Sequence, residues 1–137
     1  MNAQELFDAS ALHLLCQNER SIGSVDGLEN ACRLNNGKGL RCAIGCLIPP
    51  EYYTKRLEGS SVLDILAAAG GSNKFADREV RLTSKQVSFF SGWLQHSDLL
   101  YDLQATHDAF PIEDWSTRLR SVAVKHGLRF EMRLAHV

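Results

Sequence analysis

A stripe of apolar, aromatic and histidine side chains is the feature that most constrains the fold of this chain. Its members are spaced alternately four and three residues apart: Phe89, Trp93, His96, Leu100, Leu103, His107 and Phe110. This spacing places all of them on one face of an α-helix. Thr83 and Gln86 fit a capping box at its start, and Pro111 interrupts helical hydrogen bonding at its end. The stripe therefore predicts one continuous helix over 83–110, about seven turns long.

Apolar periodicity and capping residues predict three more helices, over 2–16, 60–69 and 115–126. Asn2 and Glu5 have the spacing of a capping box. Glycines follow the second and third of these helices, at positions where a glycine commonly ends a helix. Each of the three carries an apolar stripe, so each is expected to pack one face against the core.

Two segments with alternating apolar and polar residues predict β-strands. Residues 31–47 are typical of a hairpin with its turn at 35–39, Asn-Asn-Gly-Lys-Gly, because Asn and Gly supply the positive φ angles of tight turns. Residues 128–134 alternate apolar with charged side chains, which predicts a half-buried third strand. Residues 17–30 have weak periodicity and are expected to be irregular.

Length and composition fit a single α+β domain over residues 1–137. At this length one hydrophobic core is the default, and the 45% of residues that are hydrophobic are enough to form it. We expect about four helices packed on a small antiparallel sheet, built from the central hairpin and the C-terminal strand. The expected core consists of Phe7, Leu14, Cys42, Ile44, Leu47, Ile65, Phe89, Trp93, Leu100, Leu103, Trp115, Leu119, Val122, Phe130 and Met132.

The formal net charge of −1 conceals an alternation of sign along the chain. Residues 1–27 carry −3, residues 28–56 carry +3, residues 57–114 carry −5 and residues 115–137 carry +4. These segments predict separate acidic and basic faces, which can steer a protein partner. The candidate binding residues are Asp98, Asp102, Asp108, Glu113 and Asp114 on the acidic side, and Arg118, Arg120, Lys125, Arg129 and Arg133 on the basic side.

Two further hypotheses concern binding. The near-neutral total argues against a chain that coats nucleic acid over its whole surface, but the basic C-terminal face leaves a local nucleic-acid interface as an alternative. No glycine-rich phosphate loop accompanies that face, so nucleic acid ranks below a solvated face or a protein-docking surface. Tyr52 and Tyr53 are additional candidate interface residues, because exposed tyrosine is common at interfaces. Simple packing of these two side chains is the plainer interpretation.

The cysteines Cys16, Cys32, Cys42 and Cys46 are expected to be free thiols. The N-terminus lacks a secretory pattern and no apolar run approaches the ~20 residues of a membrane span, so we expect a soluble, cytoplasmic protein in a reducing compartment. If the hairpin bound zinc, these four cysteines would be the ligands. Cys42 and Cys46, however, would lie about 13 Å apart in a strand. We therefore expect no metal and no cofactor.

Catalytic residues are not evident in the sequence. A nucleophilic cysteine needs a neighbouring base, and nothing in the sequence pairs a cysteine with a histidine. His107 and Asp108 are adjacent, but neighbours on a helix project about 100° apart and are not expected to face each other. His107 lies on the apolar stripe and is interpreted as a core or interface residue. The sequence therefore predicts a protein that is not an enzyme.

Two blocks of the sequence resemble a family of small uncharacterised proteins from bacteriophages and bacterial genomes. Residues 41–59, RCAIGCLIPPEYYTKRLEG, resemble its pattern of C-A-I-G, L-I-P, a tyrosine and E-G. Residues 99–128 resemble its second pattern of L-x-x-L-Q, H-D, W-x-x-x-L and H-G-L. The resemblance implies a phage or prophage origin and implies no activity.

Together these observations predict a non-enzymatic phage or prophage accessory protein that binds a host or phage protein. Inhibition of a host defence system would fit this description. The expected location is the cytoplasm of a bacterial host, as a monomer or a small homo-oligomer, away from membranes. The alternatives are a nucleic-acid-binding or regulatory module that uses the basic C-terminal face, and a small zinc or cysteine protein centred on the hairpin at 32–46.

Overall fold

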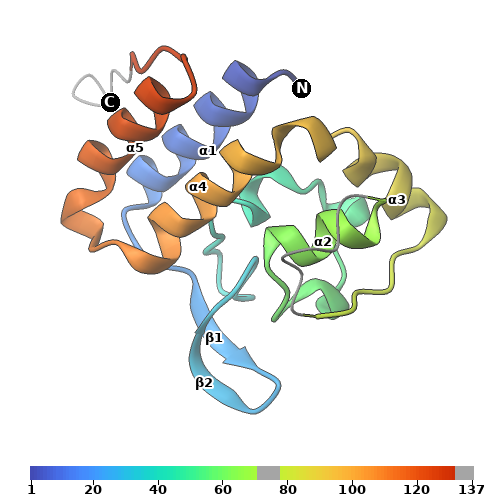
Figure 1. Cartoon of the computed structure of the whole chain (residues 1–137). Helices are drawn as coiled ribbons and strands as arrows, with labels where there is room; N and C mark the ends of the chain where they lie inside the picture. Colours follow the sequence, from blue (N-terminus) through green and yellow to red (C-terminus); the bar gives the residue numbers. More distant parts are fainter. Residues whose placement is uncertain (71–77, 132–137) are drawn as a thin grey trace.

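The computed structural model of the chain describes residues 1–70 and 78–131, and the fold has the α+β class that the sequence predicts. Over these residues it contains five α-helices and one two-stranded antiparallel sheet (Figure 1). The helices are α1 (Ala3–Gln17), α2 (Val62–Ala68), α3 (Ser84–Ser91), α4 (Ser97–Ala109) and α5 (Trp115–Lys125). The strands are β1 (Ile22–Val25) and β2 (Leu28–Cys32).

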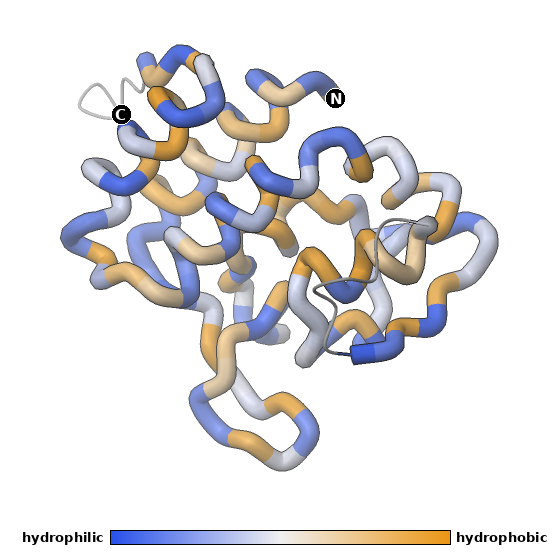
Figure 2. Tube along the Cα trace, viewed as in Figure 1, coloured by the Kyte–Doolittle hydropathy of each residue, from blue (hydrophilic) through white to orange (hydrophobic). Residues whose placement is uncertain are grey.

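The core lies where α1, α4 and α5 pack on one another, with α2 against α4. Trp115 is its largest fully buried side chain, followed by Phe7 and Phe90. The sheet is not part of this core: Figure 1 shows β1 and β2 projecting from the helical body. Hydrophobic positions nevertheless occur in the projecting hairpin (Figure 2), and Leu28 is 69% exposed there. The hairpin is therefore an arm with apolar residues facing solvent.

The predicted helix over 83–110 is in fact two helices, α3 and α4, joined by a short 3₁₀ turn over Leu94–His96. Its capping box is confirmed, since the Thr83 side chain accepts from the backbone of Gln86 and the Gln86 side chain accepts in return. The chain bends after Gly92, a residue with poor helix propensity. Packing reinforces the bend: Phe89 stacks on the Tyr52 ring at 4.4 Å. The alternating spacing alone therefore predicted one long helix where the structure has two shorter ones.

The hairpin predicted over 31–47 is wrong in position, because the paired strands lie upstream at Ile22–Val25 and Leu28–Cys32. Asp26 and Gly27 form the turn, both with positive φ (49° and 84°), as a two-residue hairpin requires. Downstream, only an isolated bridge between Asn35 and Arg41 forms within the described residues.

Close packing at Gly45 explains why the segment after residue 41 does not form a strand. A Cβ at Gly45 would lie 1.9 Å from the carbonyl oxygen of Leu34. The backbone therefore crosses itself in direct contact, and residues Gly45–Leu47 form a 3₁₀ turn instead of an extended strand. The C-A-I-G sequence is buried throughout. This motif builds the core.

The predicted third strand at 128–134 is also wrong over its described part, residues 128–131, which are irregular. Phe130 packs edge-on against Phe7, with ring centroids 5.7 Å apart. The Gln4 side chain satisfies both the backbone N–H and the carbonyl of Arg129. Met132 and Arg133 lie outside the described residues.

The irregular structure expected over residues 17–30 is wrong, because the local Asp26–Gly27 turn lets β1 and the start of β2 pair there. The three other predicted helices are confirmed. The Asn2–Glu5 capping box begins α1, and Ser61 caps α2 through Asp64. Helix α5 ends at Lys125, and Gly127 follows it with a φ of 66°. Twelve of the predicted core residues are buried, and Phe89 and Phe130 are half-buried against the core.

Candidate functional site

A cleft of about 580 Å³ lies between the hairpin and one face of α4. Residues of β2, the turn at 58–61 and Arg78 form its other walls. The α4 face is defined by Tyr101, Gln104 and Asp108, whose spacing of three and four residues places them on one side of the helix. The cleft joins segments that are far apart in the sequence, and we take it as the candidate functional site.

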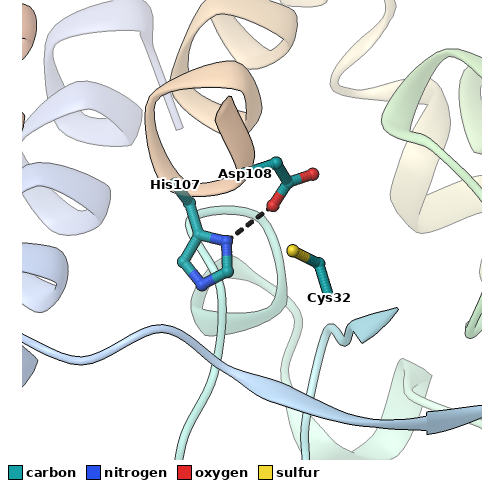
Figure 3. Close-up of side chains that lie close together, drawn as sticks. All are labelled: Cys32, His107 and Asp108. Atoms are coloured by element: carbon teal, nitrogen blue, oxygen red, sulfur yellow. Dashed lines mark hydrogen bonds and ion pairs between the residues drawn. The ribbon is translucent and has the colours of Figure 1, made fainter. Parts of the chain in front are cut away.

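Cys32, His107 and Asp108 lie together (Figure 3), and Cys32 and Asp108 line this cleft. One potential ligand atom from each lies within 4.8 Å of the others. The Nδ1 atom of His107 is 2.6 Å from Oδ1 of Asp108. The prediction that these neighbours cannot face each other is therefore wrong. Side chains that leave a helix about 100° apart can still meet when both rotate toward the space between them.

The hydrogen bonds of His107 assign its tautomer. The backbone N–H of Ser21 donates to Nε2 at 2.9 Å, so Nε2 is the unprotonated acceptor of a neutral ring. Nδ1 then carries the proton and donates it to Asp108. The fully buried imidazole also stacks on the Trp115 ring at 5.6 Å. Both nitrogens are therefore engaged, and neither is free to act as a base toward Cys32.

The same tautomer does not suit a metal ion at this cluster. A metal on Nδ1 would require the proton on Nε2, where it would point at the N–H of Ser21. The predicted zinc ligands are not brought together either: among the described residues, the group of three potential ligands is Cys32, His107 and Asp108. Cys42 is buried and Cys16 is exposed on α1. Nothing in this arrangement favours the zinc alternative.

The thiols beside the cleft are held in their protonated form. Burial, followed by the charge of Asp108 and a hydrogen bond to it, raises the pKa of Cys32 to about 11. Burial also raises the pKa of Cys46 to about 12 and that of Cys42 beyond its usual range. Because the thiolate is the nucleophile in cysteine chemistry, these three residues have the wrong protonation state for it near neutral pH.

Glu58 forms a structural carboxylate at the inner end of the cleft. It is buried and accepts hydrogen bonds from the backbone N–H groups of Leu34 and Asn35, at 2.8 and 3.0 Å. The Tyr53 hydroxyl donates to it at 2.6 Å, and Arg33 forms an ion pair at 3.7 Å. Burial and this carboxylate raise the pKa of Tyr53. Tyr53 is thus a packing residue, and the E-G motif holds the 35–39 turn in place.

The predicted acidic and basic faces meet at Asp102, a buried carboxylate on α4. His126 Nε2 lies 2.7 Å from Oδ2, Lys125 Nζ lies 2.9 Å from the same atom, and Arg118 Nη2 lies 3.8 Å from Oδ1. Burial raises the pKa of Asp102, but the hydrogen bonds from His126 and Lys125 outweigh it and leave the pKa below its usual value. Asp102, Arg118 and Lys125 therefore interact with one another within the protein and do not form separate acidic and basic surfaces.

The other predicted site residues are scattered. Tyr52 stacks on Phe89, and Arg120 lies over the Phe130 ring at 5.2 Å. Four others are exposed and do not line the cleft: Asp98, Glu113, Asp114 and Arg129. Of the predicted acidic residues, Asp108 is the one that lines the cleft.

Sequence reasoning missed Tyr101, Gln104 and Ser60 as cleft residues. The first two carried a signal, because with Asp108 they form a second stripe on α4 at helical spacing. Ser60 carried none, since only the fold brings it to the cleft.

Comparisons with protein-family models, with curated proteins and with solved structures find no match to this chain. Within residues 1–70 and 78–131, no helix has both the length and the apolar character needed to cross a bilayer.

Proposed function

We propose that this chain is a non-enzymatic protein that binds a segment of a protein partner in the cleft between the hairpin and α4. The observation that carries the proposal is the apolar rim of the cleft. Leu28 on β2 is 69% exposed and Tyr101 on α4 is 51% exposed, and both line the cleft. Exposed large apolar side chains around a concave site are typical of a binding surface.

The hairpin supplies a second property of a peptide-binding site. Among residues 1–70 and 78–131, the outer edges of both strands have no ladder partner. Leu28, Ala31 and Cys32 of β2 line the cleft, so an extended segment in the cleft would lie beside a strand with unused backbone groups. Addition of a strand to such an edge is a common mode of peptide recognition.

The chemistry of Cys32 supports binding over catalysis. Its thiol is protonated at neutral pH, and the neighbouring imidazole has both nitrogens engaged. A cysteine–histidine pair works as a nucleophile only when the base can take the thiol proton. The cluster is better suited to hold the hairpin against α4 than to carry out a reaction.

The biological setting is proposed from sequence resemblance. The two blocks that resemble small bacteriophage proteins support a phage or prophage accessory protein, acting on a host or phage protein in a bacterial cell. A host defence component is one partner of this kind.

Affinity capture from the lysate of a bacterial host tests the binding surface. The wild-type chain is compared with a Leu28→Ser, Tyr101→Ser double variant, and Val124→Ser serves as a matched control. Val124 is 76% exposed on α5 and does not line the cleft. We expect a protein captured by the wild type and by the control to be lost with the double variant, and retained after nuclease treatment.

Two outcomes would contradict the proposal. Equal capture by the wild type and the double variant would place any interface elsewhere. Loss of every captured protein after nuclease treatment would favour the nucleic-acid alternative.

A further inference from the structure

The charges that line the cleft are paired, with one exception. Asp26 is paired with Arg78 at 3.0 Å, and Glu58 with Arg33 at 3.7 Å. In the described part of the chain, Asp108 has no arginine or lysine partner, and its hydrogen-bond donors are two neutral groups, the His107 ring and the Cys32 thiol. The cleft therefore holds one carboxylate whose charge no cation of the described chain balances.

The geometry leaves this carboxylate available to a ligand. One oxygen accepts the Nδ1–H of His107, while the other points away from the ring (Figure 3). The Asp108 side chain is 34% exposed, and the exposed part faces the cleft that it lines. The bond from His107 fixes the carboxylate without neutralising it. A second charge-assisted hydrogen bond can form on the free oxygen.

A separate observation points to a hydrogen-bonding ligand in the same cleft. Ser60 lines the cleft and is only 7% exposed. Its hydroxyl has no hydrogen-bond partner among the described residues, and the same holds for Nε of Arg33, which also lines the cleft. A buried polar atom without a partner is costly. Both atoms are covered in this structure, so the Ser60 and Arg33 side chains would rotate on binding to let backbone carbonyls of an extended peptide accept from them.

We propose, building on the peptide-binding function above, that the cleft recognises a basic side chain of the partner segment. The ammonium or guanidinium group of a lysine or arginine pairs with the free oxygen of Asp108. The backbone of the segment accepts hydrogen bonds from Ser60 and Arg33. Its apolar neighbours lie against Leu28 and Tyr101 at the rim.

An anionic ligand fits this cleft less well. The two arginines in its walls are already paired with Asp26 and Glu58, so an incoming carboxylate or phosphate would have to displace an existing ion pair. It would also approach the uncompensated charge of Asp108. Charge complementarity therefore selects a cation.

Selection from a random peptide display library tests the inference. The wild-type chain is used as the target, and the Leu28→Ser, Tyr101→Ser double variant as the background. We expect the selected peptides to be enriched in lysine or arginine. Affinity for a selected peptide, measured by fluorescence anisotropy, should fall about tenfold or more in Asp108→Asn, as loss of a charge-assisted contact predicts. Asp98→Asn on the same helix is the matched control and should bind like the wild type.

A second measurement needs no protein variant. The basic residue of a selected peptide is replaced by citrulline, which keeps the shape of arginine and lacks its charge. Binding to the wild-type chain should weaken to the same extent as with Asp108→Asn. This measurement remains valid even if the Asp108→Asn variant fails to fold, which thermal unfolding would reveal.

The outcomes separate this inference from the proposed function. Peptides that lose binding with the double variant, but are not enriched in basic residues and tolerate citrulline, would overturn the basic-residue inference and leave peptide binding standing. Two results would overturn the basic-residue inference and the proposed function together. One is failure to select peptides above the background, and the other is binding that neither the double variant nor Asp108→Asn weakens.

Discussion

Helix α4 carries two carboxylates, Asp102 and Asp108, whose surroundings differ in charge. Asp102 faces α5, where Arg118, Lys125 and His126 lie within 4 Å of it. Asp108, less than two turns away, faces the cleft, and its hydrogen-bond donors among the described residues are a neutral imidazole and the Cys32 thiol. The first carboxylate is used to join two helices, whereas the second keeps an unbalanced charge at an open surface. The contrast teaches that acidic residues close in sequence can have unrelated roles.

The largest expected difference between the two sides is in stability. Asp102→Asn removes the charge that balances Arg118 and Lys125 and weakens the acceptor of the His126 hydrogen bond. We expect the free energy of unfolding to fall by about 2 kcal/mol, less than for a fully buried pair because Lys125 is largely exposed. Asp108→Asn keeps an acceptor for His107 and should cost less than about 0.5 kcal/mol. Urea denaturation of both variants measures the two losses. Equal losses would contradict the distinction.

Acid unfolding gives a smaller and more specific difference. The pKa of Asp102 in the folded protein is below its ordinary value of 3.8. A depressed carboxyl pKa contributes stability that is fully present above that ordinary value and is lost as the pH falls through the folded pKa. We therefore expect the stability of the wild type to fall more steeply below about pH 4 than that of Asp102→Asn.

His13 provides an internal reference in that experiment. Burial lowers its pKa from 6.5, so its contribution is present above pH 6.5 and declines as the pH falls below that value. Because His13 is unchanged in both proteins, its effect cancels. Parallel stability curves for the wild type and Asp102→Asn below pH 4 would refute the role of Asp102.

The smallest expected effect is on thiol reactivity beside Asp108. Cys16 is exposed and should react first with an alkylating reagent, whereas Cys32 should react slowly because its pKa is about 11. Asp108→Asn removes the charge that helps to raise this pKa and should speed alkylation of Cys32 by up to about tenfold, equivalent to one pKa unit. Mass spectrometry of the labelled peptides follows each cysteine separately. An unchanged rate at Cys32 would show that Asp108 does not influence the thiol.

The sequence was most informative about where helices begin. The capping pairs of α1, α2 and α3 could be identified from spacing alone, because a capping box involves residues only three apart. The break after Gly92 was missed although glycine is a local signal, because the contact that reinforces it, Phe89 on Tyr52, comes from a distant segment. The hairpin also had a local signal, the Asp26–Gly27 pair, which the prediction missed because the flanking residues 17–30 have weak periodicity.

The candidate site was less predictable than the fold. Its residues come from β2, the 58–61 turn and α4, and only tertiary packing brings Cys32 to His107 and Asp108. The sequence also predicted separate acidic and basic faces. In the structure Asp102 of the acidic set pairs with Lys125 of the basic set across adjoining helices. Charge patterns show which groups are present, whereas the contacts between helices decide which of them remain available.

The hydrogen bond from Ser21 to His107 makes the imidazole a reporter of the hairpin. Ser21 immediately precedes β1, so this hydrogen bond attaches the base of the arm to α4, beside the contact of Cys32 with Asp108. If the arm moved away from α4, Nε2 would lose that donor and the preference for the Nδ1–H tautomer would weaken. The nitrogen chemical shifts of a single buried ring therefore record whether the arm is docked, without any label on the arm itself.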